Sequence, residues 1–212
     1  MFRIIALERE YGSGGGGIAA DLARHFGWKL WDQQLTTEIA QRANVAPHVV
    51  ALCDERVDSR LYRLAKTFWR GSYERSLPLA DSTVFDTDRM MAMMQGIMSH
   101  IAAEGNAVVV GRGSPFFLRE RADTFRVFTY APREEKIRRL LLMGKSPSEC
   151  DDLVDSVDQE RRAYIKHYFN AEWPTRSLYH MMVNTAMGDK NAIGLILHAM
   201  ETLSHAPKED TP

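Results

Sequence analysis

Hydrophobic and polar positions along the chain follow two patterns, short apolar runs and longer stretches with helical spacing. The runs are typical of buried strands, and the spaced positions are typical of helices that cover a sheet. Strands are expected at 3–8, 28–31, 107–110, 125–130 and 181–184. Helices are expected at 18–26, 133–143, 147–168 and 190–203. This alternation predicts an α/β fold with a parallel sheet.

Between residue 33 and about residue 104 the pattern is helical and contains no clear strand. Helices are expected at 34–43, 47–54, 57–70 and 86–103, with a loop at 71–83. A second α/β domain would need strands of its own, so we interpret 33–104 as a helical insertion on the sheet. The last of these helices carries Met90, Met91, Met93, Met94 and Met98. We expect these methionines to pack in the core, and a homo-oligomer interface is the alternative.

The helix expected after residue 146 has a clear start signal. Ser146 suits the N-cap, Pro147 suits the first turn, and Glu149 completes a capping box. After the last helix, residues 206–212 are expected to form a tail.

The length, charge and cysteine content of the chain limit the kinds of partner and the cellular location that we expect. The chain has 212 residues, with 27 Lys and Arg against 28 Asp and Glu. This length suits one domain, and the near-neutral balance argues against nucleic acid as a partner. No apolar run approaches the roughly 18 residues that span a bilayer, and the first residues are charged too early for a signal peptide. Cys53 and Cys150 have no metal-ligand spacing, so we expect reduced thiols in a cytoplasmic protein.

A glycine cluster, Gly12-Ser13-Gly14-Gly15-Gly16-Gly17, joins the first expected strand to the first helix. Backbone N–H groups in such a loop can converge on an anion, and the helix N-terminus adds a partial positive charge. Side chains would block that approach, so the glycines indicate a phosphate-binding loop. A glycine-rich turn without a ligand is the alternative.

Two known loops compete for this cluster. Gly12, Gly14 and Gly17 match the dinucleotide fingerprint G-x-G-x-x-G, with Asp32 as its ribose-binding acid. However, Arg9-Glu10-Tyr11 separates the strand from the first glycine, where the dinucleotide turn is tighter.

The second loop is the P-loop, G-x-x-x-x-G-K-[ST]. Aligning Gly15 with its second glycine gives the right loop length. Glu10 then replaces the first glycine, Gly16 replaces the lysine and Gly17 replaces the Ser or Thr. On the generic motifs alone, both alternatives stay open.

Further stretches along the chain match signature positions of one known family, in the same order. They are Arg9-Glu10-Tyr11-Gly12-Ser13-Gly14-Gly15 with Ile18-Ala19, Gly27-Trp28, Trp31-Asp32-Gln33-Gln34-Leu35, Val108-Val109-Val110-Gly111-Arg112-Gly113, Arg126-Val127-Phe128-Thr129-Tyr130-Ala131-Pro132, Asp158-Gln159-Glu160-Arg161-Arg162-Ala163-Tyr164 with Tyr168-Phe169, and Val183-Asn184-Thr185. Together they resemble the cytidylate kinase-like family, P-loop proteins related to the nucleoside monophosphate kinases. The likeness runs over about residues 3–203.

The resemblance implies a single kinase-like domain with a P-loop NTPase three-layer core, a parallel sheet, a helical acceptor-binding insertion and a helical lid. The expected core comprises about 1–32, 105–144 and 176–205. The insertion at about 33–104 would close over the acceptor nucleotide, and the lid at about 145–175 would close over the reacting phosphates.

The resemblance also implies an activity, namely phosphoryl transfer from ATP, with Mg²⁺, to a nucleoside monophosphate such as CMP or dCMP. Gly16 and Gly17 supply neither the lysine charge nor the hydroxyl of a P-loop. One alternative is therefore a nucleotide-binding protein without phosphotransferase activity, and another is a kinase of a different small metabolite. A dinucleotide-dependent oxidoreductase is a third, weaker hypothesis.

Site roles follow from the resemblance for the glycine loop and the strand ends. The backbone of Gly12, Ser13, Gly14, Gly15, Gly16 and Gly17 would bind donor phosphates. Arg9 is a candidate replacement for the missing lysine, or else an exposed loop charge. Arg112 ends an expected strand at the sheet edge where ligands bind, so it would bind the acceptor phosphate, or else form a structural ion pair. Asp32 would organise the acceptor site or Mg²⁺, or it would cap a following helix; no metal ligands are assigned.

On the expected lid helix, Arg161 and Arg162 would stabilise the charge that develops during transfer. Asp158 lies three residues before Arg161, so its carboxylate can orient that guanidinium on one helical face. A solvated charged helix is the alternative. Four cations of the preceding helix are interpreted as a solvated face, with stacking of some of them on a donor base as the alternative: Arg133, Lys136, Arg138 and Arg139.

Overall fold

The computed structural model describes residues 1–32 and 87–205, with side chains from residue 91 onward in the second range. The helices expected at 34–43, 47–54 and 57–70, the loop at 71–83 and the tail at 206–212 lie outside the described residues. Cys53 also lies outside them, whereas Cys150 is a buried free thiol.

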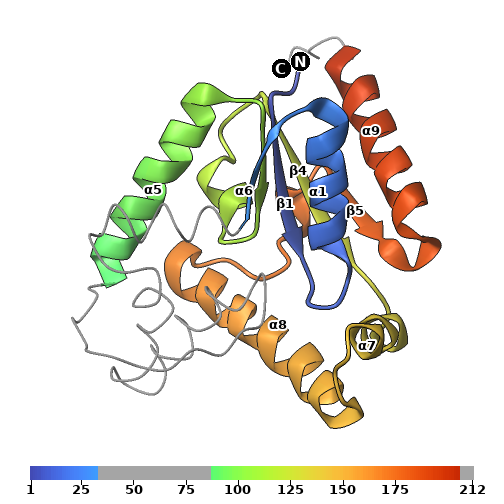
Figure 1. The fold of residues 1–212 in the computed structure, drawn as a ribbon. Coiled ribbons are helices and arrows are strands. Elements are labelled where there is room, and N and C mark those ends of the chain that lie inside the picture. The colour runs from blue at the N-terminus through green and yellow to red at the C-terminus, as the bar shows by residue number, and fades with distance from the viewer. Residues whose placement is uncertain (33–86, 206–212) are drawn as a thin grey trace.

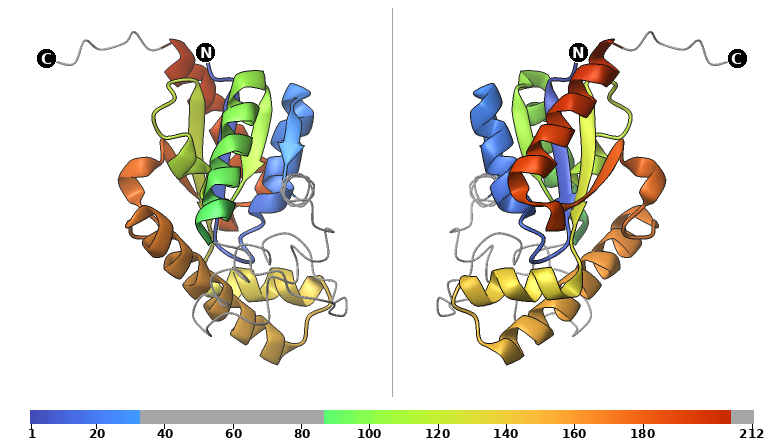
Figure 2. Two further views of the ribbon diagram at one scale, coloured as in Figure 1. Left: turned by 90° about the vertical axis from the view of Figure 1, so that its left-hand side faces the viewer. Right: turned by 90° about the vertical axis from the view of Figure 1, so that its right-hand side faces the viewer.

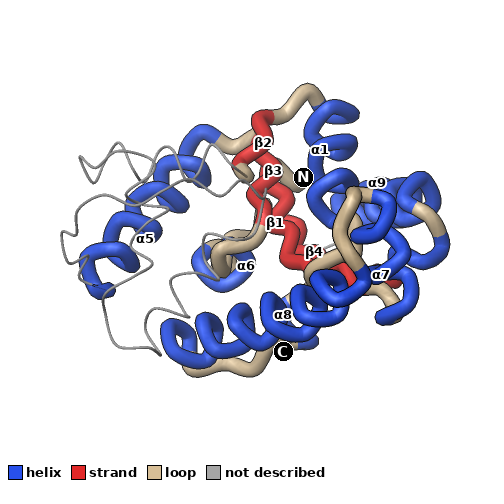
Figure 3. The backbone as a smooth tube through the Cα atoms, turned by 60° about the horizontal axis from the view of Figure 1, so that its bottom comes forward, coloured by secondary structure: helices blue, strands red, loops and turns tan. Residues whose placement is uncertain are grey.

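The described strands form one parallel sheet in the order β2-β3-β1-β4-β5 (Figure 3). They are β1 Ile4–Arg9, β2 Lys29–Trp31, β3 Ala107–Val110, β4 Thr124–Tyr130 and β5 Met181–Asn184. The α/β class and the parallel sheet expected from the hydrophobic pattern are confirmed. Because β1 lies between β3 and β4, the loop that follows β1 leaves from the centre of the sheet.

Helices cover both faces of this sheet and make three layers (Figures 1 and 2). The longer helices are α1 Gly15–Phe26, α5 Thr87–Glu104, α7 Arg133–Leu142, α8 Pro147–Phe169 and α9 Asp189–His205. Short helical turns are α6 Ser114–Phe117, η1 Arg176–Leu178 and η2 Thr185–Met187. These three turns were not expected from the sequence because they are shorter than the window in which helical periodicity is visible.

The two sides of the core follow from the alternation of side chains along a strand. Ile5 and Leu7 of β1 pack with the buried face of α1 and α9. Ile4 and Ala6 pack with α5, α6 and the C-terminal part of α8. Within this second cluster Met94 and Met98 of α5 are buried, as expected for core methionines.

The two long helices α7 and α8 form a hairpin beside the end of the sheet from which the glycine loop leaves (Figure 1). Side chains of this hairpin can therefore reach the loop. Among the described helices, none is both long and apolar enough to cross a membrane.

The start of α8 confirms the expected capping box. The Ser146 hydroxyl accepts a hydrogen bond from the Glu149 N–H, while the Glu149 carboxylate accepts one from the Ser146 N–H at 2.8 Å. We expect Ser146→Ala to lower the free energy of unfolding by about 1 kcal/mol, because an N-cap hydrogen bond is lost.

Urea denaturation would measure this loss. Ser148→Ala is the matched control, since this exposed serine lies inside the first turn, where its hydroxyl contacts that of Ser146 at 3.4 Å but accepts no described hydrogen bond from a backbone N–H. An equal loss in both variants would show that the cap does not stabilise α8.

Candidate functional site

The glycine loop runs from the end of β1 into α1. Gly12 and Gly14 have φ values of 75° and 79°, a left-handed conformation that glycine adopts without a steric penalty. Helix α1 begins at Gly15, and no side chain caps its first turn. At Gly15 a Cβ atom would collide with Thr129 and with the Cβ of Arg9. At Gly16 and Gly17 it would meet none of the described residues within 4 Å, so the described part of the chain leaves one side of the helix start open.

Sheet order separates the two loops that compete for this cluster. In the dinucleotide-binding fold the second strand lies beside the first. Here β2 pairs with β3, and β3 lies between β2 and β1. The helix also begins at Gly15, the residue aligned with the second glycine of the P-loop. The fold therefore supports the P-loop interpretation.

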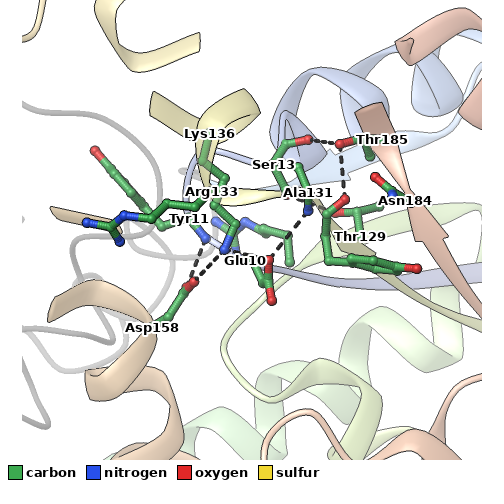
Figure 4. Close-up of polar contacts among 12 residues, drawn as sticks. Glu10, Tyr11, Ser13, Thr129, Ala131, Arg133, Lys136, Asp158, Asn184 and Thr185 are labelled. Carbon is green, nitrogen blue, oxygen red and sulfur yellow. Dashed lines mark hydrogen bonds and ion pairs between the residues drawn. The ribbon is translucent and has the colours of Figure 1, made fainter. Parts of the chain in front are cut away.

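On the side that faces α7 and the end of β5, the glycine loop is held by hydrogen bonds to the Ser13 carbonyl. That oxygen accepts hydrogen bonds from the Thr185 hydroxyl at 2.6 Å and from the Arg139 guanidinium. Arg139 also donates to the Thr185 carbonyl at 2.9 Å and to Asp189 at 3.0 Å. The Ser13 hydroxyl lies 3.3 Å from that of Thr129 (Figure 4). These contacts tie the loop to the ends of β4 and β5.

Just before its first glycine, the loop contacts α8 through the buried carboxylate of Asp158. Asp158 accepts hydrogen bonds from the Tyr11 N–H at 2.9 Å and from the Arg161 guanidinium at 3.1 Å. The Lys136 ammonium lies 3.4 Å from the second Asp158 oxygen and 2.5 Å from the Glu10 carboxylate. Asp158, Lys136 and Arg161 are 4 %, 7 % and 7 % exposed, so these charges are almost fully removed from water.

A second charged cluster lies at the ends of β1, β2 and β3. Arg112 donates to the Asp32 carbonyl at 2.8 Å, and its guanidinium lies 3.6 Å from the Asp32 carboxylate. Arg9 lies 3.8 Å from the same carboxylate oxygen, and the Arg161 guanidinium donates to the Arg9 carbonyl at 2.8 Å. Three buried guanidinium groups thus gather around the loop, with Asp32 and Asp158 among their carboxylate partners, and guanidinium N–H groups are strong donors to an anionic ligand.

The pKa values of two of these guanidinium groups, Arg9 and Arg112, are lowered by their buried surroundings. Burial, together with the nearby charge of Arg161, lowers the pKa of Arg9 to about 10. Burial also lowers the pKa of Arg112, although the Asp32 carboxylate opposes the shift. An anion bound among these groups would relieve the cost of burying them.

Arg112 has a special backbone conformation. It lies in the left-handed region with φ 56°, between Gly111 and Gly113, which both have φ 69°. A non-glycine residue in this region is sterically disfavoured. The turn directs the Arg112 side chain toward Asp32 at the end of β2.

Glu8 is a buried acid that the sequence analysis did not single out. Only 3 % of its surface is exposed, and burial raises its pKa above the ordinary value of 4.5. The folded state therefore holds the Glu8 proton to higher pH than the unfolded chain does, and stability declines as the pH rises above 4.5. We expect Glu8→Gln to raise the melting temperature at about pH 8 and to raise it less at about pH 5.

Thermal unfolding across this pH range would measure the effect. Glu120→Gln, at a strongly exposed carboxylate, should change little at either pH and serves as the control. A gain from Glu8→Gln that does not depend on pH would contradict the assignment.

The structure corrects the interpretation of α7 as a solvated face. Lys136 is buried against the loop, and Arg139 binds the loop carbonyl of Ser13. Arg133 and Arg138 are exposed as expected; the first pairs with Asp151 and Asp155 of α8, and the second pairs with Glu135. Arg162 is exposed as well, whereas Arg161 reaches the Arg9 carbonyl at the end of β1.

Several residues of the site carried a signal that the sequence analysis did not use. Glu10, Thr129 and Thr185 lie at or just beyond the carboxyl ends of β1, β4 and β5. Polar residues at that edge of a parallel sheet commonly line a ligand site. Lys136 and Arg139 are three residues apart on α7, a spacing that puts both on one helical face.

Metal ligands are not gathered in the described part of the chain. Within residues 1–32 and 91–205, no group of three or more His, Cys, Asp or Glu side chains could hold a metal ion. Asp32 lies within 4 Å of two guanidinium groups, which suits the positioning of arginine.

The sheet order and the glycine loop between β1 and α1 define a P-loop kinase-like fold. A sequence profile of the cytidylate kinase-like family matches residues 4–187, and the chain therefore belongs to this family. A comparison with curated proteins gives no match.

Solved structures show the same fold. An uncharacterized protein from Eubacterium ventriosum ATCC 27560 is similar with a TM-score of 0.68 and 19 % identity, over 95 % of this chain and 99 % of that one. Shikimate kinase from Acinetobacter baumannii, in complex with shikimate, gives 0.54 and 14 %, over 97 % of each chain. A sugar kinase from Janibacter sp. HTCC2649 gives 0.51 and 15 %, over 95 % of each chain. At such identities the likeness concerns the fold alone.

Proposed function

We propose that this protein transfers the γ-phosphoryl group of ATP to a nucleoside monophosphate, with CMP or dCMP as the favoured acceptor. One observation carries the proposal: Arg9, Arg112 and Arg161 gather beside a glycine loop at the carboxyl edge of a parallel sheet. This combination suits phosphoryl transfer, because the transition state spreads negative charge over several oxygens. Family membership supports the same chemistry.

The loop fits the phosphates of the donor. Its first three glycines lie against Lys136, Arg139 and Thr129, so the chain can fold tightly there. The open side at Gly16 and Gly17 leaves the N–H groups of the first turn accessible to an anion. Bound ATP would supply the electrophilic γ-phosphoryl group.

The arginines fit the acceptor and the transfer. Arg112 would bind the acceptor phosphate, with Asp32 holding its guanidinium in place. Arg161 would stabilise the charge that develops during transfer, and Asp158 would orient it. Since α8 covers the loop, it would also keep water away from the reacting phosphates.

The described residues support a Mg²⁺ site less directly than they support phosphate binding. The described residues offer no cluster of carboxylates for it, and Gly17 replaces the P-loop hydroxyl. Mg²⁺ commonly binds through phosphate oxygens and water, with few protein ligands. We therefore assign no residue of this chain to the metal.

A second candidate function rests on Gly16 and Gly17. Without the loop lysine and hydroxyl, the protein would bind a nucleotide without transferring phosphate, or it would phosphorylate another small metabolite. The solved shikimate and sugar kinases have a similar fold.

Phosphoryl transfer from Mg·ATP to a panel of nucleoside monophosphates tests both candidates. We expect turnover of one pyrimidine nucleotide. ATP binding without transfer to any nucleotide would contradict the nucleotide kinase and favour the second candidate, and a panel of hydroxylated metabolites would then follow.

A further inference from the structure

We propose that Lys136 of α7 supplies the cation that the glycine loop lacks at position 16, so that the donor phosphates are bound by an ammonium from outside the loop. The inference rests on the proposed function in one respect, namely that the donor is a nucleoside triphosphate. Its test reads binding alone, so it is separate from the question of phosphoryl transfer.

The first argument is the position of Lys136. A Cβ atom on Gly12 would lie 3.0 Å from the Lys136 Cβ and 3.3 Å from its Cα, so the α7 backbone packs directly on the loop. The ammonium reaches Glu10, two residues before Gly12, at 2.5 Å. Figure 4 shows this side chain extending from α7 toward Asp158 of α8. Lys136 therefore lies along the loop where it leaves β1.

The second argument is that the described hydrogen bonds of the neighbouring cations, Arg139 and Arg161, hold them to backbone carbonyls. Arg139 is bound to the carbonyls of Ser13 and Thr185. Arg161 donates to the Arg9 carbonyl and to Asp158, and its guanidinium is a rigid fork. An ammonium on a four-carbon stem is more mobile and has three N–H donors. Its two described contacts leave one donor for a phosphate oxygen.

The third argument is that both carboxylates keep other hydrogen-bond donors when one N–H of Lys136 turns toward a ligand. Asp158 would keep the Tyr11 N–H and the Arg161 guanidinium as partners. Glu10 would keep the Ala131 N–H at 3.4 Å. Neither carboxylate is thus left without a hydrogen-bond donor.

Charge balance gives a fourth argument. Glu10 occupies the position of the first P-loop glycine, and its carboxylate would repel phosphates that approach the loop. The Lys136 ammonium at 2.5 Å neutralises this charge. A single lysine therefore offsets the repulsion and offers a donor to the phosphate.

The open space at Gly16 makes a rescue experiment feasible. A Cβ atom there would meet none of the described residues within 4 Å, so Gly16→Lys can place an ammonium at the ordinary P-loop position. If the two positions serve the same phosphates, this substitution should compensate for the loss of Lys136.

Isothermal titration with ATP tests the proposal on the full chain. We expect Lys136→Met, which keeps most of the apolar stem, to weaken ATP binding at least tenfold and AMP binding much less. Adding Gly16→Lys to this variant should restore most of the loss. The control is Arg138→Met, an exposed cation on the same helix that pairs only with Glu135 among the described residues and should leave binding unchanged.

Thermal unfolding of each variant shows whether it is folded at the titration temperature. Wild-type ATP affinity in Lys136→Met would overturn the proposal. A loss that Gly16→Lys does not reduce would overturn it too, since Lys136 would then act through the shape of the loop. ATP binding and rescue without any phosphoryl transfer would uphold this inference and contradict the nucleotide kinase.

Discussion

Replacing Arg161 with alanine should slow phosphoryl transfer by about a thousandfold, the lower range for an arginine that stabilises the transferring phosphoryl group. The Arg161 guanidinium is buried between the Arg9 carbonyl and the Asp158 carboxylate. It therefore lies beside the loop before any ligand arrives, and little reorganisation is needed when charge develops. Steady-state kinetics with Mg·ATP and the best acceptor would measure the loss, which should fall mainly on kcat.

The adjacent Arg162 provides a matched comparison. It is the same residue type on the same helix, but it is exposed. Arg162→Ala should reduce the rate far less than Arg161→Ala does, although the sequence alone gives both residues the same role. Arg161→Lys should recover little activity, because an ammonium lacks the planar fork of donors that a guanidinium presents to a phosphoryl group. Equal losses in the two alanine variants would contradict the assignment of Arg161.

Replacing Asp158 with alanine should lower the free energy of unfolding by about 3–5 kcal/mol, because the substitution leaves buried cations without their counter-charge. Asp158 is 4 % exposed, and it accepts hydrogen bonds from Lys136, Arg161 and the Tyr11 backbone. Its loss would also remove the hydrogen bond from the Tyr11 N–H that ties α8 to the loop. Urea denaturation of both proteins at neutral pH would measure the change.

Asp155→Ala on the same helix is the control for this loss. Its carboxylate pairs with Arg133 at 2.6 Å, and both side chains are well exposed. An exposed pair of this kind contributes about 0.2–1 kcal/mol, so the variant should remain close to the wild type. A similarly small loss for Asp158→Ala would mean that solvent or a rearranged partner compensates for the carboxylate.

Most of the described fold was predictable because its strands are short apolar runs with clear boundaries. The run Val108-Val109-Val110 predicts a buried strand, and β3 is found at Ala107–Val110. The order of the strands was not predictable from the pattern alone, since β2 pairs with β3 across a long insertion. The family resemblance implied a parallel sheet, and the order of its strands came from the structure.

The site was predictable in part. Arg112 and Asp32 follow directly from their places at strand ends, and they lie together in the structure. Lys136 and Arg139 were misread because charged positions on a helix usually face solvent. In α7 the face that carries them packs on the glycine loop, a contact between distant parts of the sequence.

The left-handed backbone at Arg112 is a place where the stability of the fold and the needs of the candidate site conflict. Glycine at this position would relieve a conformational penalty of about 1–2 kcal/mol, and both neighbours are already glycine. A chain optimised only to remain folded would have glycine at all three positions of the turn. The arginine therefore marks a place where the molecule gives up part of its stability margin to keep a positive charge at the edge of the sheet.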